Sequence, residues 1–191
     1  MRVLFVGGAG PVGEAAVPRV REAGHEVAVA HSGAHEPAVL ADVEHLHGGR
    51  DELLGVGGAV ERWRPEVLVD TFAGGATAAK AAQIGDTAAR CGAGQVVAVS
   101  SIDVYRHCAL AGVDDHPSAT FALDPLPLTE GAVRRDARPQ SAGSQHDNVA
   151  MEDALHGAPS VTVLRPGAIY GPCLHPRVLR EWVSRRQGRS R

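Results

Sequence analysis

The fold is decided by a stretch near the amino end, Val3-Leu4-Phe5-Val6-Gly7-Gly8-Ala9-Gly10-Pro11-Val12-Gly13. Four apolar residues that end at glycine are typical of a short, fully buried strand, and a proline directly after the glycines suits the first turn of a helix. Gly8, Gly10 and Gly13 have the GxGxxG spacing of such a strand–turn–helix unit. Glycine at these positions allows a tight turn, close approach of the backbone to a pyrophosphate and close packing of helix against strand.

A helix amino end holds anions through its free N–H groups and its positive dipole end, so this unit predicts a dinucleotide site. We expect NAD or NADP to contact the loop through Gly7, Gly8, Gly10, Pro11, Val12 and Gly13. The next predicted strand ends in His31 and Ser32, where an acidic residue would accept hydrogen bonds from ribose hydroxyls and an arginine would favour a 2′-phosphate. Both residues are expected to contact the cofactor, but neither decides between NAD and NADP.

Strand-like and helix-like segments alternate along the rest of the chain. We expect strands at 3–6, 26–30, 43–47, 67–70, 95–100 and 161–164, and helices at 11–23, 51–64, 76–91 and 148–156. This alternation predicts the α/β class, with a doubly wound parallel sheet in a Rossmann-type domain. We assign 1–175 to an NAD(P)-binding domain and 176–191 to a terminal helix and basic tail, with a long surface loop at 106–143.

Composition narrows the class of protein. The chain of 191 residues is long enough for one sizeable core, and its net charge of −3 gives no reason to expect nucleic acid or an anionic membrane as a partner. No apolar run reaches the roughly 18 residues of a membrane span, and no signal peptide is evident. The three cysteines form neither a disulfide framework nor a CxxC metal site, so we expect a cytoplasmic protein.

Five segments together resemble the NAD-dependent epimerase/dehydratase family of the extended short-chain dehydrogenase/reductases. They lie, in the family's order and spacing, at 7–13, 70–73, 99–105, 127–130 and 164–172. The resemblance implies hydride transfer at a hydroxyl-bearing carbon of a sugar-like or secondary-metabolite substrate. It also implies that the cofactor is bordered by Phe72, Ala73, Ser100, Pro166, Gly167 and Ala168.

In that family the second serine of the S-S-x-x-V-Y motif, here Ser101, contacts the substrate hydroxyl at the catalytic centre. Ser100 and Ser101 also end an apolar strand, where side chains of a Rossmann sheet meet a bound ligand. The alternative for Ser101 is a hydroxyl that hydrogen-bonds only to its own backbone.

The family's Y-x-x-x-K motif is missing from the segment before the last strand. Its tyrosine and lysine positions fall on Ser144 and Asn148 in one register, and on His146 and Ala150 in another. Three interpretations remain open. His146 could replace the tyrosine in acid/base work; the domain could bind nucleotide without hydride chemistry and act through a partner protein; or Ser144 could cap a helix with Asp147, leaving His146 solvated.

Members of that family continue into a smaller C-terminal domain that closes over the substrate. The resemblance fades near Trp182, so we expect this substrate domain to be largely missing, and a homodimer or partner chain to cover the site.

His45 and His47 lie two residues apart on a predicted strand and therefore face the same side, as a pair of metal ligands would. No third ligand is evident from the sequence, so no metal site is predicted.

Overall fold

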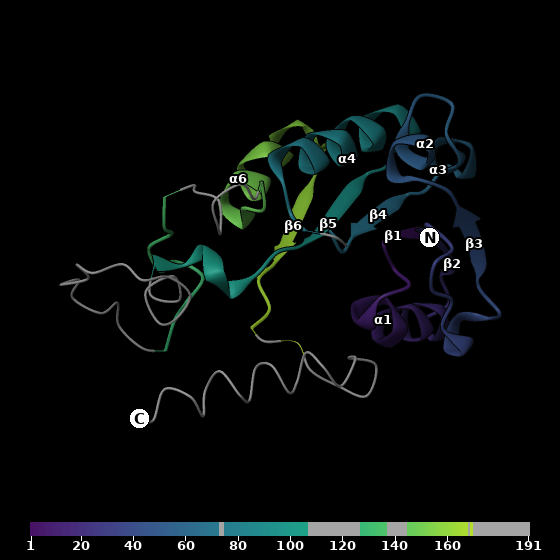
Figure 1. The fold of residues 1–191 in the computed structure, drawn as a ribbon, viewed down its shortest axis with the longest axis horizontal. Coiled ribbons are helices and arrows are strands. Elements are labelled where there is room, and N and C mark those ends of the chain that lie inside the picture. Colours follow the sequence, from purple (N-terminus) through teal and green to yellow (C-terminus); the bar gives the residue numbers. More distant parts are fainter. Residues whose placement is uncertain (73–74, 107–126, 137–144, 168, 170–191) are drawn as a thin grey trace.

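The structure, a computed structural model, describes residues 1–72, 75–106, 127–136, 145–167 and 169. Six strands form one parallel sheet in the order β3-β2-β1-β4-β5-β6 (Figure 1). The strands are β1 (Arg2–Val6), β2 (Glu26–His31), β3 (Glu44–His47), β4 (Val67–Asp70), β5 (Gln95–Val99) and β6 (Val161–Leu164). This order confirms the predicted doubly wound, Rossmann-type α/β fold.

Helices cover both faces of the sheet (Figure 1). The helical elements are α1 (Pro11–Glu22), α2 (Arg50–Leu54), α3 (Ala59–Trp63), α4 (Ala78–Cys91), α6 (Asn148–Asp153), and the 3-10 turns η1 (Ala38–Leu40), η2 (Ile102–Val104) and η3 (Ala154–Gly157). Successive side chains of β1 point to opposite faces of the sheet and so belong to two parts of the core. Leu4 packs with residues of α2, α3, α4 and α6, whereas Phe5 packs with residues of α1 and η1. No helix in the described part of the chain is long and apolar enough to cross a membrane.

The parallel register brings the carboxyl ends of the central strands to one edge. Val6 of β1 pairs with both Ala30 of β2 and Asp70 of β4, and Asp70 pairs in turn with Ala98 of β5. The segments that leave these strands, including the glycine loop, therefore start side by side, which is where ligands bind in such sheets.

The single helix expected over 51–64 is wrong, because α2 and α3 are separated by Gly55-Val56-Gly57-Gly58. Gly57 has a φ of 69°, which a helix interior does not allow, and each glycine costs about 1 kcal/mol relative to alanine inside a helix. The spacing of apolar residues continues across the break, so this pattern predicted one helix where the structure has two.

Several expectations concern residues that the structure does not describe. The terminal helix and tail at 176–191, most of the loop at 106–143, Ser144, Ala73 and Ala168 all lie outside the described residues.

The break between α2 and α3 leads to a stability prediction. A Cβ at Gly58 would lie 2.4 Å from the Leu53 carbonyl oxygen, so Gly58→Ala should lower the free energy of unfolding by ~1–3 kcal/mol. At Gly49, which also precedes a short helix, a Cβ meets nothing within 4 Å, so Gly49→Ala should stay within ~1 kcal/mol of wild type. Urea unfolding of both variants tests this, and equal losses would contradict it.

Candidate functional site

The glycine loop leaves β1 through a left-handed turn. Gly7 has a φ of 73°, its N–H donates to the Ala30 carbonyl at 2.8 Å, and the Thr71 hydroxyl donates to the Gly7 carbonyl at 3.0 Å. The loop is thereby fixed to both strands that flank β1. Gly10 is the N-cap of α1 and Pro11 is its first residue. Because Gly10 has no side chain, the N-cap residue supplies no side-chain hydrogen bond to the helix.

The glycines of this loop have different surroundings. A Cβ at Gly13 would lie 1.8 Å from the Gly8 carbonyl oxygen, so the helix can pack on the loop only if residue 13 is glycine. A Cβ at Gly8 would lie 2.6 Å from Cβ of Phe5. At Gly10, by contrast, the nearest atom is the Gly7 carbonyl oxygen at 3.9 Å. Packing therefore requires glycine at positions 8 and 13. At position 10 packing would allow a larger residue, and the glycine leaves open space beside the amino end of the helix.

A cavity of about 370 Å³ opens beside this loop. Its lining comes from the ends of β1 and β2, the glycine loop and α2, and includes Gly7, Gly10, His31, Ser32, Gly48 and Arg50. His31 is only 8% exposed, and burial, followed by the neighbouring His45 and His47, lowers its imidazole pKa. The ring is therefore neutral at pH 7, so it carries no charge that would select for or against a 2′-phosphate.

Arg50 and Asp70 form an ion pair next to this cavity that sequence reasoning missed. Asp70 is fully buried at the end of β4, and one of its oxygens accepts from Arg50 Nη2 at 2.5 Å. Its other oxygen accepts the Phe72 N–H at 2.8 Å, which holds Phe72 at a φ of 49°, unusual for a side chain of this size. The pairing could not be read from the sequence, because the two residues are 20 positions apart on separate elements.

A second, smaller cavity of about 240 Å³ brings both predicted catalytic residues together. Ser101 and His146 line it with Phe72, Ser100 and Asn148. Ser101 is also the N-cap of η2, because its Oγ accepts the Asp103 N–H at 3.2 Å. The local hydrogen bond considered for Ser101 is thus present, and the hydroxyl can still donate its own proton to a ligand.

His146, which lines the same cavity, is held by a backbone N–H. Its Nδ1 accepts the Ala76 N–H at 2.8 Å, which leaves the proton of a neutral ring on Nε2, 3.5 Å from the side-chain amide nitrogen of Asn148. Among the three open interpretations, a solvated His146 is therefore wrong: the side chain is half-buried, and the loop that enters α4 holds its ring. The expected cap is also wrong for α6, whose N-cap is Asp147 and not Ser144, since the Asp147 carboxylate accepts the Val149 N–H at 3.0 Å.

Asn148 lies where one register of the family motif places the lysine. Its side-chain amide donates to both carboxylate oxygens of Asp103, at 2.9 and 3.0 Å, and the residue is buried. Asn148 therefore links α6 to η2 and supplies no positive charge to the cavity.

Glu152 connects α6 to the strand ends, a role that sequence reasoning did not find. Its carboxylate accepts from Ser100 Oγ at 2.6 Å and from two nitrogens of Arg165 at 2.7 and 3.0 Å. These hydrogen bonds raise the pKa of Arg165 despite its partial burial, and Arg165 donates in turn to the Tyr105 hydroxyl at 3.0 Å. The segment that follows Arg165 is thereby anchored, with Pro166 and Gly167 lining a third cavity of about 850 Å³ that Val12 also lines.

Comparison with known proteins found no matching protein-family model and no matching curated protein. Solved structures do match. The Bordetella bronchiseptica enzyme WbmG in complex with NAD is 18% identical with a TM-score of 0.63, and the match covers 98% of this chain and 60% of that one. The Thermus thermophilus UDP-glucose 4-epimerase in complex with NAD is 21% identical with a TM-score of 0.64, covering 92% and 58%. This chain has their fold.

A third match is TunA, described as an NAD-dependent NDP-hexosamine 5,6-dehydratase from tunicamycin biosynthesis, which is 20% identical with a TM-score of 0.64. The match covers 92% of this chain and 57% of that one, so the chain spans less than two thirds of the solved structures it matches. The predicted resemblance to NAD-dependent epimerases and dehydratases is confirmed as a likeness of fold.

The Glu152 interactions lead to a prediction about stability. Glu152→Gln removes a 5% exposed charge that pairs with Arg165 at 2.7 Å and also lies 3.5 Å from Arg134, so the free energy of unfolding should fall by ~2 kcal/mol. The neighbouring Asp153, 51% exposed, pairs with Arg134 at the surface, so Asp153→Asn should cost less than ~1 kcal/mol. Denaturant unfolding of the two variants measures the difference. If Asp153→Asn lowered the free energy of unfolding more than Glu152→Gln does, the larger contribution assigned to the buried charge would be contradicted.

Proposed function

We propose that the chain is an NAD(P)-binding, epimerase/dehydratase-like oxidoreductase that acts on a hydroxyl-bearing carbon of a sugar-like or secondary-metabolite substrate. The observation that carries the binding part is the contrast within the glycine loop. At Gly8 and Gly13 the packing leaves no room for a side chain. Gly10, by contrast, faces open space beside the amino end of α1 and the cavity. NAD in the WbmG and UDP-glucose 4-epimerase structures, which share this fold, supports the choice of ligand.

The described residues fit such a cofactor at three places. Gly7 and Gly10 line the cavity beside the loop, and with Gly8, Pro11, Val12 and Gly13 they would form the diphosphate site. His31 and Ser32, which line the same cavity, would contact the adenosine ribose. Phe72, Ser100, Pro166 and Gly167 would border the nicotinamide, and Ala73 and Ala168 stay predictions of the same kind. The choice between NAD and NADP stays open, since neither an acidic residue nor an arginine ends β2.

A bound nicotinamide would supply hydride exchange with a carbon that carries a hydroxyl. The chain's own part is to orient that oxygen between Ser101 Oγ and His146 Nε2, which line the same cavity. Because Nδ1 of His146 accepts a backbone N–H, taking up a second proton or moving the first would break that hydrogen bond. We therefore assign His146 as a hydrogen-bond donor that polarises the substrate oxygen. The proton that hydride transfer releases or consumes at this oxygen would then pass to or from solvent, and not through a replacement for the family's tyrosine.

Two observations favour the alternative, a non-catalytic nucleotide-binding module that acts through a partner protein. Asn148 places no ammonium group in the cavity, and a backbone N–H occupies Nδ1 of His146. Both affect the chemistry and leave the dinucleotide site unchanged, so binding and turnover need separate tests.

Binding is tested by fluorescence titration with NADH and NADPH. Gly10→Ala puts a methyl group into the open space of the loop and should weaken binding by at least about tenfold without loss of stability. The matched control is Gly94→Ala. Its Cβ would also meet a single atom, the Glu66 carbonyl oxygen at 3.9 Å, but at the opposite edge of the sheet, and it should bind as wild type does. If the wild type binds neither dinucleotide, the proposed function fails.

Turnover is tested by incubating the protein with NAD⁺ and a panel of sugar nucleotides and following each sugar nucleotide by chromatography, because an epimerase or dehydratase returns the hydride to its product and leaves no net NADH. We expect the wild type to convert at least one of them. His146→Ala should slow this reaction by about 10²-fold, and His146→Gln, which keeps an N–H donor but does not titrate, should recover part of the rate. Wild-type rates in both variants would remove His146 from the site, and a protein that binds NAD but converts no sugar nucleotide would favour the non-catalytic alternative.

A further inference from the structure

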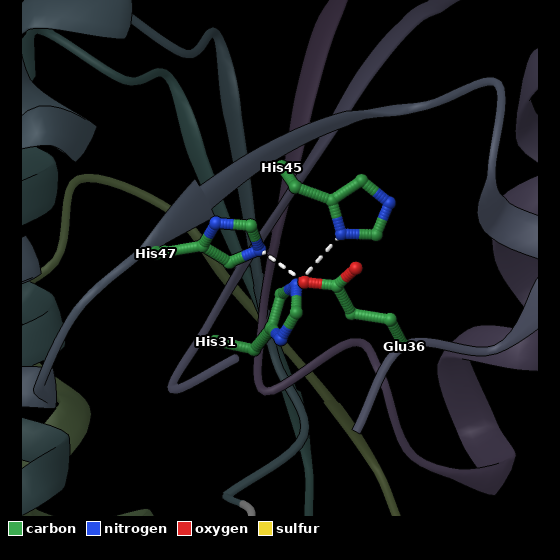
Figure 2. Close-up of side chains that lie close together, drawn as sticks. All are labelled: His31, Glu36, His45 and His47. Atoms are coloured by element: carbon green, nitrogen blue, oxygen red, sulfur yellow. Dashed lines mark hydrogen bonds and ion pairs between the residues drawn. The ribbon is translucent and has the colours of Figure 1, made fainter. Parts of the chain in front are cut away.

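Three imidazoles and one carboxylate converge at the carboxyl ends of β2 and β3 (Figure 2). His31 Nε2 lies 2.7 Å from His45 Nδ1, and His47 Nε2 lies 2.7 Å from a Glu36 carboxylate oxygen. One ligand atom from each of the four residues lies within 4.8 Å of every other. The cluster is separate from the cavity that contains Ser101 and His146.

Strand register explains how the histidines meet. His31 pairs with His47 across the parallel ladder, and His45 pairs with Val29, two residues before His31. Because side chains alternate along a strand, His31, His45 and His47 share one face of the sheet, the face on which Val29 packs under α1 and η1. The loop that follows β2 then returns Glu36 to the same place (Figure 2).

We propose that His31, Glu36, His45 and His47 form a binding site for a divalent transition-metal ion, with zinc as the ion that this ligand set suits. Neutral imidazole and carboxylate are established zinc ligands, with zinc–ligand distances of about 2.0–2.2 Å. Tetrahedral coordination at those distances separates the ligand atoms by about 3.3 Å. The observed separations, from 2.7 Å to at most 4.8 Å, lie on both sides of that value, so small side-chain rotations would bring the ligand atoms to tetrahedral distances.

His45 already has the hydrogen bond typical of a metal-binding histidine. Its Nε2 lies 2.9 Å from the carbonyl oxygen of Leu40, which can only accept, so Nε2 carries the proton and Nδ1 presents its lone pair to the cluster. A backbone carbonyl that fixes the tautomer and orientation of the ring is the usual outer-shell partner of such a ligand.

His31 and His47 must each lose the proton on Nε2 to bind an ion through that atom. In the structure His47 Nε2 donates to the Glu36 carboxylate at 2.7 Å. His31 Nε2 donates to His45, while His31 Nδ1 accepts the Gly33 N–H at 3.2 Å. Coordination through Nε2 moves the proton to Nδ1, which ends the Gly33 hydrogen bond. Gly33 lies in an exposed loop at a φ of 81°, a conformation that glycine leaves easily, so this rearrangement is local.

The surroundings suit a bound cation that arrives from solvent. The side chains of His47 and Glu36 are 51% and 52% exposed, so they offer an entry path, whereas His31 lies beneath them. Glu36 offsets one of the two charges of the ion. The proposal does not depend on dinucleotide binding, although His31 also lines the cavity beside the glycine loop.

The test uses the full chain without a histidine tag, stripped with EDTA and titrated calorimetrically with Zn²⁺. We expect one ion per chain with a dissociation constant of about 1 µM or lower, and no comparable binding of Mg²⁺, which prefers oxygen ligands. Co²⁺ in place of Zn²⁺ should give the visible absorption of a tetrahedral site without a thiolate-to-cobalt band in the near ultraviolet.

His47→Ala and Glu36→Gln change exposed side chains, so the fold should persist while Zn²⁺ affinity falls at least tenfold and the Zn²⁺-dependent rise in Tm is lost. The matched control is His35→Ala. His35 lies next to Glu36 in the same exposed loop but pairs with Glu14 at 3.4 Å, outside the cluster, and its loss should leave Zn²⁺ binding unchanged.

Three results would overturn the proposal. They are no Zn²⁺ binding by the wild type, an affinity in His47→Ala equal to that of wild type, and a thiolate-to-cobalt band, which would place the ion on cysteine elsewhere in the chain. Dinucleotide titration of the same samples is read separately, so failure of the metal site and failure of the cofactor site are distinguishable.

Discussion

The close approach of α1 to the Gly8 carbonyl is the constraint on which the rest of the molecule depends. Only the hydrogen of a glycine at residue 13 fits between helix and loop, and this fit sets where the amino end of α1 points. It also keeps the turn short enough for Gly7 to bond to β2 and for Thr71 to bond to the turn. The lack of room for a side chain at residue 13 therefore directs the amino end of α1, and with it Gly10, toward the carboxyl edge of the sheet. This placement of the helix dipole does not require a bound ligand.

The sequence predicts the parts of this arrangement that depend on neighbouring residues. The strand–glycine–helix unit at 3–13 and the alternation of elements suffice to predict the sheet, since a buried apolar run and a turn are local features. The helix at 51–64 was mispredicted because periodicity outweighed the three glycines in Gly55-Val56-Gly57-Gly58. The pairs Arg50–Asp70 and Glu152–Arg165 could not be predicted, because charged residues on different elements meet only once the topology is known.

The chemistry of the smaller cavity is limited by the same backbone that builds it. His146 and Ser101 line one cavity because the segment before α6, which carries His146, is hydrogen-bonded to the entry to α4. Yet the Ala76 N–H occupies Nδ1 of His146, and Asp103 bonds to both Ser101 and the Asn148 amide. A site built from such satisfied groups orients an oxygen more readily than it exchanges protons, which separates this chain's geometry from the tyrosine and lysine chemistry of the family it resembles.

His31 joins the two proposals, because one residue ends β2 beside the cofactor cavity and also belongs to the histidine cluster. In this type of sheet the end of β2 is the place where a side chain meets the adenosine ribose, so the charge there affects dinucleotide choice. A neutral His31 leaves that charge near zero, whereas three neutral imidazoles, one carboxylate and a divalent ion together carry a single net positive charge. No acidic residue ends β2, so the sequence leaves cofactor preference undecided. The charge at this position would instead depend on whether the proposed site holds a metal ion.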